Sequence, residues 1–161
     1  MTKVRTHLWF DREAKEAADF YCSIVENSRI VNVTHATDAM GDQEGEVLTV
    51  GFELAGHPVM ALNAGPNDAF NTSMSIMIET KDQAETDRYW NALIADGGEE
   101  KPCGWLRDKY GVFWQVIPEV LQKMLDDPDR AAASRANAAM LKMGKIVIAD
   151  LEKAFAGRAA A

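Results

Sequence analysis

One pattern occurs twice in this chain and limits its possible folds: a strand, then a helix, then further strands. The first copy begins at Val4 to Phe10, a segment rich in aromatic and β-branched residues. The second copy begins at Ser73 to Glu79, where apolar residues recur at every second position. Internal duplication on this scale predicts two similar folding units.

A helix signal follows each first strand. Asp11 is a possible N-cap, with Glu13 and Glu16 in the first turn, where carboxylates interact favourably with the helix dipole. Asp82 and Glu85 have capping-box spacing at the start of the second helix. Apolar residues then recur at helical spacing in both segments, which predicts two amphipathic helices.

Further strands are expected after each helix. A tight turn at Ala55-Gly56 joins two of them into a hairpin. Because hairpins and a single helix occur in each half, the pattern favours an α+β fold over an open parallel α/β sheet. The expected strands are 29–36, 45–54 and 58–63 in the first half, and 100–106 and 112–117 in the second.

Gln115 is a polar residue in the otherwise apolar segment 112–117. An unpaired buried amide costs about 1–3 kcal/mol, so this side chain is either a structural cross-link or a group that points into a pocket. The nearby Trp105 and Phe113 could line a ligand cleft by stacking, although aromatic residues at such positions also form ordinary cores.

Residues 119–161 lie outside the repeated pattern and are expected to be helical, with a break at Asp127-Pro128. Their apolar side chains need cover, either from a partner subunit or from the back of a sheet. The residues concerned are Met140, Leu141, Met143, Ile146, Ile148, Leu151 and Phe155.

Composition excludes several classes of protein. The chain of 161 residues carries a net charge of −8, which argues against nucleic-acid binding and against binding to an anionic membrane surface. Cys22 and Cys103 are too few for a disulfide framework and are expected to be free thiols in a reducing cytoplasm. We find neither a signal peptide nor an apolar run near the ~20 residues of a membrane span, so a cytoplasmic location is expected.

Four segments carry a resemblance to known proteins: THLWFDREAKEAADFY (6–21), FELAGHPVMALNAGP (52–66), CGWLRDKYGVFWQVIP (103–118) and AMLKMGKIVIADLEKAF (139–155). They resemble the PhnB-like branch of the vicinal-oxygen-chelate (glyoxalase/bleomycin-resistance/dioxygenase) superfamily. Members of this branch often carry the label 3-demethylubiquinone-9 3-methyltransferase.

The resemblance implies a glyoxalase-like domain at 1–118, with βαβββ modules at about 1–64 and 72–118, and a C-terminal helical extension at 119–161. The modules would pair curved mixed sheets around a cleft, usually within a homodimer.

The resemblance also implies where a metal would bind. Metal-dependent members hold one divalent ion with four side chains, normally His, Glu or Gln, which are suitable donors for such ions. The corresponding positions fall near Val4 or Thr6, near Asn63, near Ser73 or Ser75, and on Gln115. None of these is His or Glu, so we predict no metal and no other cofactor.

The chain has three histidines, His7, His35 and His57. Strand alternation places His7 on the face opposite Thr6, so His7 would pack against a helix or an interface if even-numbered positions line the cleft. His35 and His57 are expected to be structural or solvated.

The methyltransferase label finds no support in the residues, because a glycine-rich loop between a strand and a helix, as needed for an adenosyl cofactor, is missing. Our prediction is a protein that binds a small, partly apolar molecule. The alternatives are a metal-dependent lyase, isomerase or dioxygenase of the same superfamily, and an interaction protein with a vestigial cleft. The sequence leaves open whether any reaction is catalysed. The predicted ligand-binding residues are Thr6, Asn63, Ser75, Trp105, Phe113 and Gln115.

Overall fold

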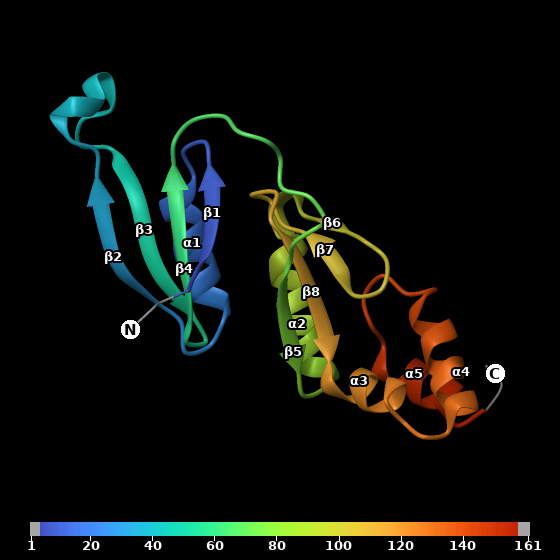
Figure 1. Ribbon diagram of the computed structural model, residues 1–161. Coiled ribbons are helices and arrows are strands. Elements are labelled where there is room, and N and C mark those ends of the chain that lie inside the picture. Colours follow the sequence, from blue (N-terminus) through green and yellow to red (C-terminus); the bar gives the residue numbers. More distant parts are fainter. Residues whose placement is uncertain (1–3, 158–161) are drawn as a thin grey trace. The chain divides into compact units, whose positions relative to one another are not determined.

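The structure is a computed structural model that describes residues 4–157. The chain divides into two compact units, with the boundary between Ala69 and Phe70. Each unit contains one strand, one α-helix and then three strands, as the ribbon in Figure 1 shows. The expected α+β fold with two βαβββ modules is therefore confirmed.

The first unit is a four-stranded sheet in the order β1-β4-β3-β2 with helix α1 on one face. β1 runs parallel to β4, and the remaining neighbours are antiparallel. A short 3-10 helix, η1 (Asp38–Gln43), lies between β2 and β3. The other elements are β1 (Thr6–Phe10), α1 (Ala14–Ile24), β2 (Arg29–His35), β3 (Val47–Leu54) and β4 (His57–Asn63).

The core of the first unit lies between α1 and the sheet. Ala14, Ala17 and Ala18 are fully buried, and their small side chains let the helix backbone approach the strands closely. Tyr21 and Phe52 extend this contact, with ring centroids 6.4 Å apart. The alternation of buried and exposed residues along each strand gives the sheet a face toward α1, the helix face, and an opposite face.

The second unit repeats this arrangement. Its sheet has the order β5-β8-β7-β6, with β5 parallel to β8, and α2 packs on one face. Trp90 and Leu93 of α2 are buried, as are Leu106, Trp114 and Val116 of the sheet. The elements are β5 (Ile76–Thr80), α2 (Gln83–Ile94), a 3-10 turn η2 (Ala95–Gly97), β6 (Glu99–Glu100), β7 (Trp105–Arg107) and β8 (Phe113–Pro118).

Local signals located α2 correctly but not the start of α1. Asp82 is the N-cap of α2, and its side chain accepts a hydrogen bond from the Glu85 backbone N–H at 2.8 Å. α1 instead begins at Ala14, whose N–H donates to Oδ1 of Asn63 at 2.8 Å. The prediction that Asp11 caps α1 is therefore wrong, because a side chain from β4 satisfies this donor.

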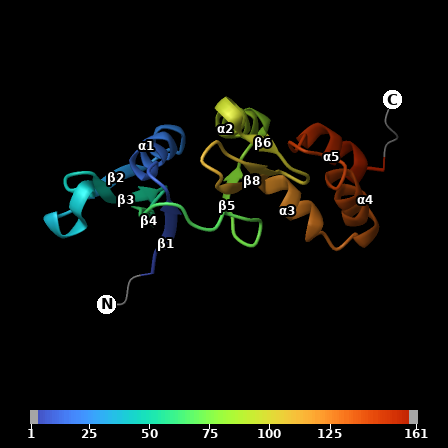
Figure 2. The ribbon, with the colours of Figure 1, turned by 90° about the horizontal axis from the view of Figure 1, so that it is seen from above.

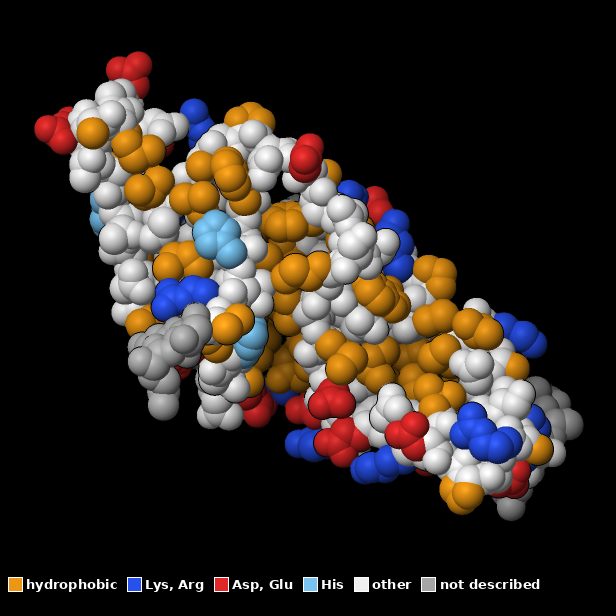
Figure 3. Space-filling model, in the orientation of Figure 1, with side chains coloured by type: hydrophobic (Ala, Val, Ile, Leu, Met, Phe, Trp, Pro, Cys, Tyr) orange, Lys and Arg blue, Asp and Glu red, His pale blue; other side chains and the backbone are white. Residues whose placement is uncertain are grey.

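The C-terminal segment forms α3 (Glu119–Leu125), α4 (Arg130–Met140) and α5 (Ile148–Phe155), grouped at one end of the second unit in Figures 1 and 2. Their core is Leu121, Met124, Ala136, Ile146 and Leu151, and Ile117 of β8 packs against it. Figure 3 shows hydrophobic side chains gathered over this region. Most apolar residues of the tail thus find cover in their own chain, at the end of the second sheet rather than on its back, whereas Leu141 is 60% exposed.

Hydrogen bonds fix the tail to the second unit. The N–H groups of Cys103 and Gly104 donate to the carbonyls of Met143 and Gly144 at 2.7 and 2.8 Å. The Gln83 side chain donates to the Ile146 carbonyl and accepts from the Ile148 N–H. These contacts interrupt the expected strand 100–106, whose residues divide between β6, a turn and β7.

Candidate functional site

Gln115 lies at the centre of the face of the second sheet that points away from α2, which we call its opposite face. Its Cα partners are Met77 on β5 and Trp105 on β7, so the three side chains share one face. The neighbouring residues Trp114 and Val116 point toward α2 and are fully buried. Met77, by contrast, is 53% exposed. This face therefore presents an aromatic residue, an amide and a thioether in one row.

The Gln115 amide is both a cross-link and an available acceptor. Its Nε2 donates to the Ser75 hydroxyl at 2.8 Å, which ties β8 to the residue just before β5. The side chain is half-buried, and no hydrogen bond to Oε1 is found among the described residues. The two interpretations of this amide from the sequence are thus compatible, since one end is structural and the other is available.

The turn before β8 is held by a buried carboxylate. Asp108 is 1% exposed and accepts hydrogen bonds from the backbone N–H groups of Tyr110 and Val112 and from Nε1 of Trp114. The last distance is 2.8 Å, and Trp114 is fully buried. Because Trp114 directly precedes Gln115, this carboxylate fixes the strand that positions the amide. Sequence reasoning missed this carboxylate as the group that organises the turn.

Phe113 shares the face with Gln115, two residues earlier on β8, and is 8% exposed. Its partner across the ladder is Arg107. Four predicted residues are therefore brought together on this face of the second sheet: Ser75, Trp105, Phe113 and Gln115.

The other two predicted residues lie in the first unit. Thr6 shares the helix face with Leu8 and Phe10, which are 2% and 4% exposed, and its hydroxyl is 2.9 Å from Nε2 of His57. The even-numbered positions of β1 therefore face α1. His7 and Trp9 are exposed on the opposite face. The even-numbered positions therefore do not line a cleft on that face, and the condition under which His7 would pack against a helix or an interface is not met.

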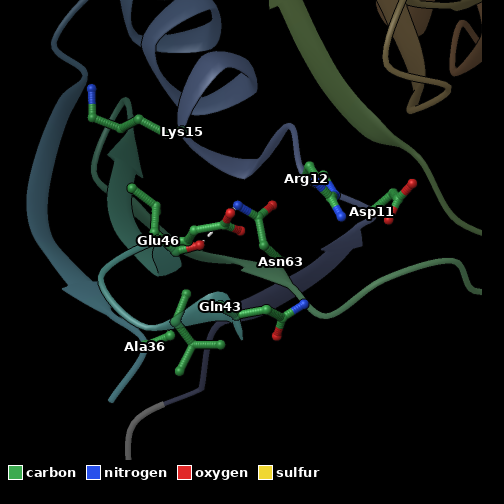
Figure 4. A pocket seen from close by; sticks show the side chains of 9 residues that line it. Asp11, Arg12, Lys15, Ala36, Gln43, Glu46 and Asn63 are labelled. Atoms are coloured by element: carbon green, nitrogen blue, oxygen red, sulfur yellow. Dashed lines mark hydrogen bonds between the residues drawn. The ribbon is translucent and has the colours of Figure 1, made fainter. Parts of the chain in front are cut away.

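Asn63 lines a cavity of about 280 Å³ at the end of the first sheet (Figure 4). Its Oδ1 accepts from Ala14, as described, and its Nδ2 donates to the Val47 carbonyl at 3.0 Å. Around Asn63 the lining is charged with both signs, by Arg12 and Lys15 and by Asp11 and Glu46. This cavity consequently favours neither anions nor cations.

The residues at the four superfamily positions do not fit a divalent metal. Gln115 and Ser75 offer neutral oxygens, and the Thr6 and Asn63 side chains already hydrogen-bond within the first unit. No group of three or more His, Cys, Asp or Glu side chains suited to holding a metal occurs within residues 4–157. We therefore derive no chemistry through a metal.

The thiols are poor candidates for nucleophiles. Burial, followed by the charge of Asp19, raises the pKa of the Cys22 thiol, which keeps it in the protonated, unreactive form. Cys103 has a positive φ of 63° in the turn held by the tail, which indicates a structural position. Neither cysteine is in a disulfide.

Comparisons with known proteins agree with this architecture. A family model described as 3-demethylubiquinone-9 3-methyltransferase matches residues 2–117, which leaves out the C-terminal helices. The chain is similar to a solved PhnB protein from Bacillus cereus, named as a proposed 3-demethylubiquinone-9 3-methyltransferase. The two share 30% identity over 73% of this chain and 99% of that chain, with a TM-score of 0.66.

Two more distant structures share the fold alone. Protein PA1353 from Pseudomonas aeruginosa is 20% identical over 74% of this chain and 98% of its own, with a TM-score of 0.63. FosX, a fosfomycin resistance protein from Listeria monocytogenes solved with Mn(II) and sulfate, is 17% identical over 78% and 98%, with a TM-score of 0.56. A search of curated proteins finds no match. No helix within residues 4–157 has the length and apolar character to cross a membrane.

Proposed function

Because the chain belongs to the 3-demethylubiquinone-9 3-methyltransferase family, the PhnB-like branch of the vicinal-oxygen-chelate superfamily, we propose that it binds a small, partly apolar molecule without a metal. The proposed site is the opposite face of the second sheet. The observation that carries this proposal is the row Met77, Gln115 and Trp105, in which the hydrogen bond to Ser75 holds the amide in place. A rigid amide beside an aromatic surface orients a ligand at little entropic cost.

Each residue has a proposed role. Trp105 and Phe113 supply apolar surface for a planar group, and Gln115 accepts a hydrogen bond from the ligand through Oε1. Ser75 positions the amide. Thr6 and Asn63 lie in the first unit, and their part in ligand binding stays a prediction. The homodimer implied by the resemblance and the cytoplasmic location expected from the sequence stay predictions.

Methyl transfer is not supported by the strand-to-helix connections. Binding an adenosyl cofactor on a strand–turn–helix unit relies on glycines that let the backbone approach the ligand. Here β1 leads into α1 through Asp11-Arg12-Glu13, and β5 leads into α2 through Lys81-Asp82, and neither connection contains glycine. We therefore propose binding rather than methyl transfer for this face.

The test is a titration with benzamide, a neutral planar probe, followed by two-dimensional NMR. We expect shifts at the Trp105 indole and the Gln115 amide, with a Kd in the millimolar range for so small a probe. Gln115→Leu, which keeps the approximate size but removes the amide, should weaken binding about fivefold to tenfold. Gln122→Leu, a matched change on α3, should leave binding unchanged. Shifts that avoid this face would refute the proposal.

Metal dependence is tested separately by calorimetry with Mn²⁺ and Zn²⁺. We expect no stoichiometric site. Tight 1:1 binding that disappears in Gln115→Ala would instead support a metal-dependent enzyme of the same superfamily.

A further inference from the structure

The opposite face of the second sheet also carries an arginine that the sequence interpretation did not use. Arg107 is the Cα partner of Phe113 and lies two residues after Trp105 on β7, so its side chain belongs to the same face. Two residues along a strand span about 7 Å. The Cα atoms of Arg107 and Trp105 are therefore separated by about the length of one small planar molecule.

The charges around Arg107 do not cancel. Arg107 Nη2 and Lys101 Nζ both bind Glu99, each at 2.8 Å. The hydrogen bond from Lys101 and the charge of Arg107 lower the pKa of Glu99, so this carboxylate is ionised at neutral pH. Arg107 and Lys101 thus share the single carboxylate of Glu99, and this group of three side chains carries one net positive charge.

The guanidinium of Arg107 also has unused hydrogen-bonding capacity. Its Nε is buried and has no hydrogen-bond partner among the described residues. Buried N–H groups without an acceptor are uncommon in folded proteins and call for a physical explanation. The side chain as a whole remains 41% exposed, so part of the guanidinium is accessible.

A carboxylate on the ligand would supply both a negative charge for this cationic group and an acceptor for Nε of Arg107. The Nε and Nη2 groups of arginine form a planar fork that binds the two oxygens of a carboxylate in parallel. A ligand bound this way would provide the missing acceptor for Nε after a small rotation of the guanidinium. It would replace Glu99 at Nη2, and Glu99 would keep Lys101 as its partner.

We infer that the molecule bound on this face carries a carboxylate or a similar planar oxyanion, which Arg107 binds while Trp105 and Gln115 hold its apolar and polar body. This inference rests on the proposed function, since it names the chemical class of ligand for the same site. It adds a specificity-determining residue, Arg107, and predicts selection for anionic over neutral molecules.

The test compares benzoate with benzamide, which have nearly the same shape and differ in charge. We expect the wild-type protein to bind benzoate about tenfold more tightly than benzamide, with a preference that weakens as salt is added. Arg107→Gln should remove this preference, so that benzoate and benzamide bind with similar affinity. Arg107→Lys, which keeps the charge but loses the fork, should retain only part of it. The matched control Arg88→Gln, on α2, should keep the full preference.

A direct readout does not depend on any variant folding. The Nε–Hε resonance of Arg107 in the wild-type protein should shift with benzoate and not with benzamide. Equal affinity for the two probes, or a preference that survives in folded Arg107→Gln, would overturn the inference while leaving the proposed function intact. If neither probe binds this face, the proposed function fails and the inference fails with it.

Discussion

The Asp108 carboxylate provides a sharp test of how the site is built. Asp108→Asn keeps the size of the side chain but exchanges one acceptor oxygen for an NH₂ group. If Oδ1 continues to accept from the Tyr110 and Val112 backbone, the new NH₂ group faces Nε1 of Trp114, which is also a donor. The indole N–H is then buried without an acceptor, since Trp114 is fully buried.

These contacts determine how much stability Asp108→Asn should remove. An unsatisfied buried donor costs about 1–3 kcal/mol, and the remaining hydrogen bonds lose the assistance of a charged acceptor. We therefore expect Asp108→Asn to lower the free energy of unfolding by roughly 2–4 kcal/mol, a large part of the ~5–15 kcal/mol typical of a domain. For a chain of this length the midpoint of thermal unfolding should fall by roughly 5–15 °C.

The assay is urea unfolding followed by tryptophan fluorescence and circular dichroism. A double-mutant cycle with Trp114→Phe isolates the carboxylate–indole pair, because Phe removes the N–H that Asn leaves unpaired. The two changes together should destabilise the protein by clearly less than the sum of their separate effects. Additive effects, or an Asp108→Asn variant within about 0.5 kcal/mol of the wild type, would refute the reasoning.

Three further predictions concern caps, the tail and pH. Asn63→Ala should destabilise α1 by about 0.5–2 kcal/mol through loss of its cap, seen as faster amide exchange in α1. Asn63→Asp should have an intermediate effect, because it keeps the acceptor for the Ala14 N–H but loses the Nδ2 donor to the Val47 carbonyl. Gln83→Ala should make residues 143–157 more susceptible to limited proteolysis, since it removes both hydrogen bonds to the tail, and unchanged cleavage relative to Gln122→Ala would count against this role. The hydrogen bond from Lys145, followed by that from Gln83, lowers the pKa of Asp87 below its usual value. The ionised Asp87 therefore stabilises the folded protein fully above its unfolded pKa of about 3.9, and this stabilisation is lost as the pH falls through the lower folded pKa. The stability difference between wild type and Lys145→Met, below about 1 kcal/mol for so exposed a pair, should therefore be constant above pH ~5 and shrink in acid; a constant difference at all pH values would contradict it.

The sequence predicted the elements because their signals are local. Alternating apolar residues mark strands, helical spacing marks α1 and α2, and the spacing of Asp82 and Glu85 marks the start of α2. The two modules followed from the order of these elements, and the resemblance in segment 103–118 supported the same fold.

The errors concern contacts between residues far apart in the chain. The cap of α1 comes from Asn63, 49 residues after Ala14, so a local search chose Asp11 instead. The side of β1 that faces α1 depends on which residues the helix covers, and alternation alone gave only the relative placement of Thr6 and His7. Arg107 was overlooked because its surroundings come from β6 and β8 together.

The sequence by itself thus determined the order of strands and helices, the family and the unusual amide at Gln115, since these depend on residue type and spacing along the chain. Only the tertiary structure decided what that amide does. Pairing of β8 with β5 and β7 places Gln115 between Met77 and Trp105, and the side chain of Ser75, 40 residues away, holds one end of the amide. The physical reason is that a hydrogen bond or an ion pair depends on distance in space, which the order of residues does not specify.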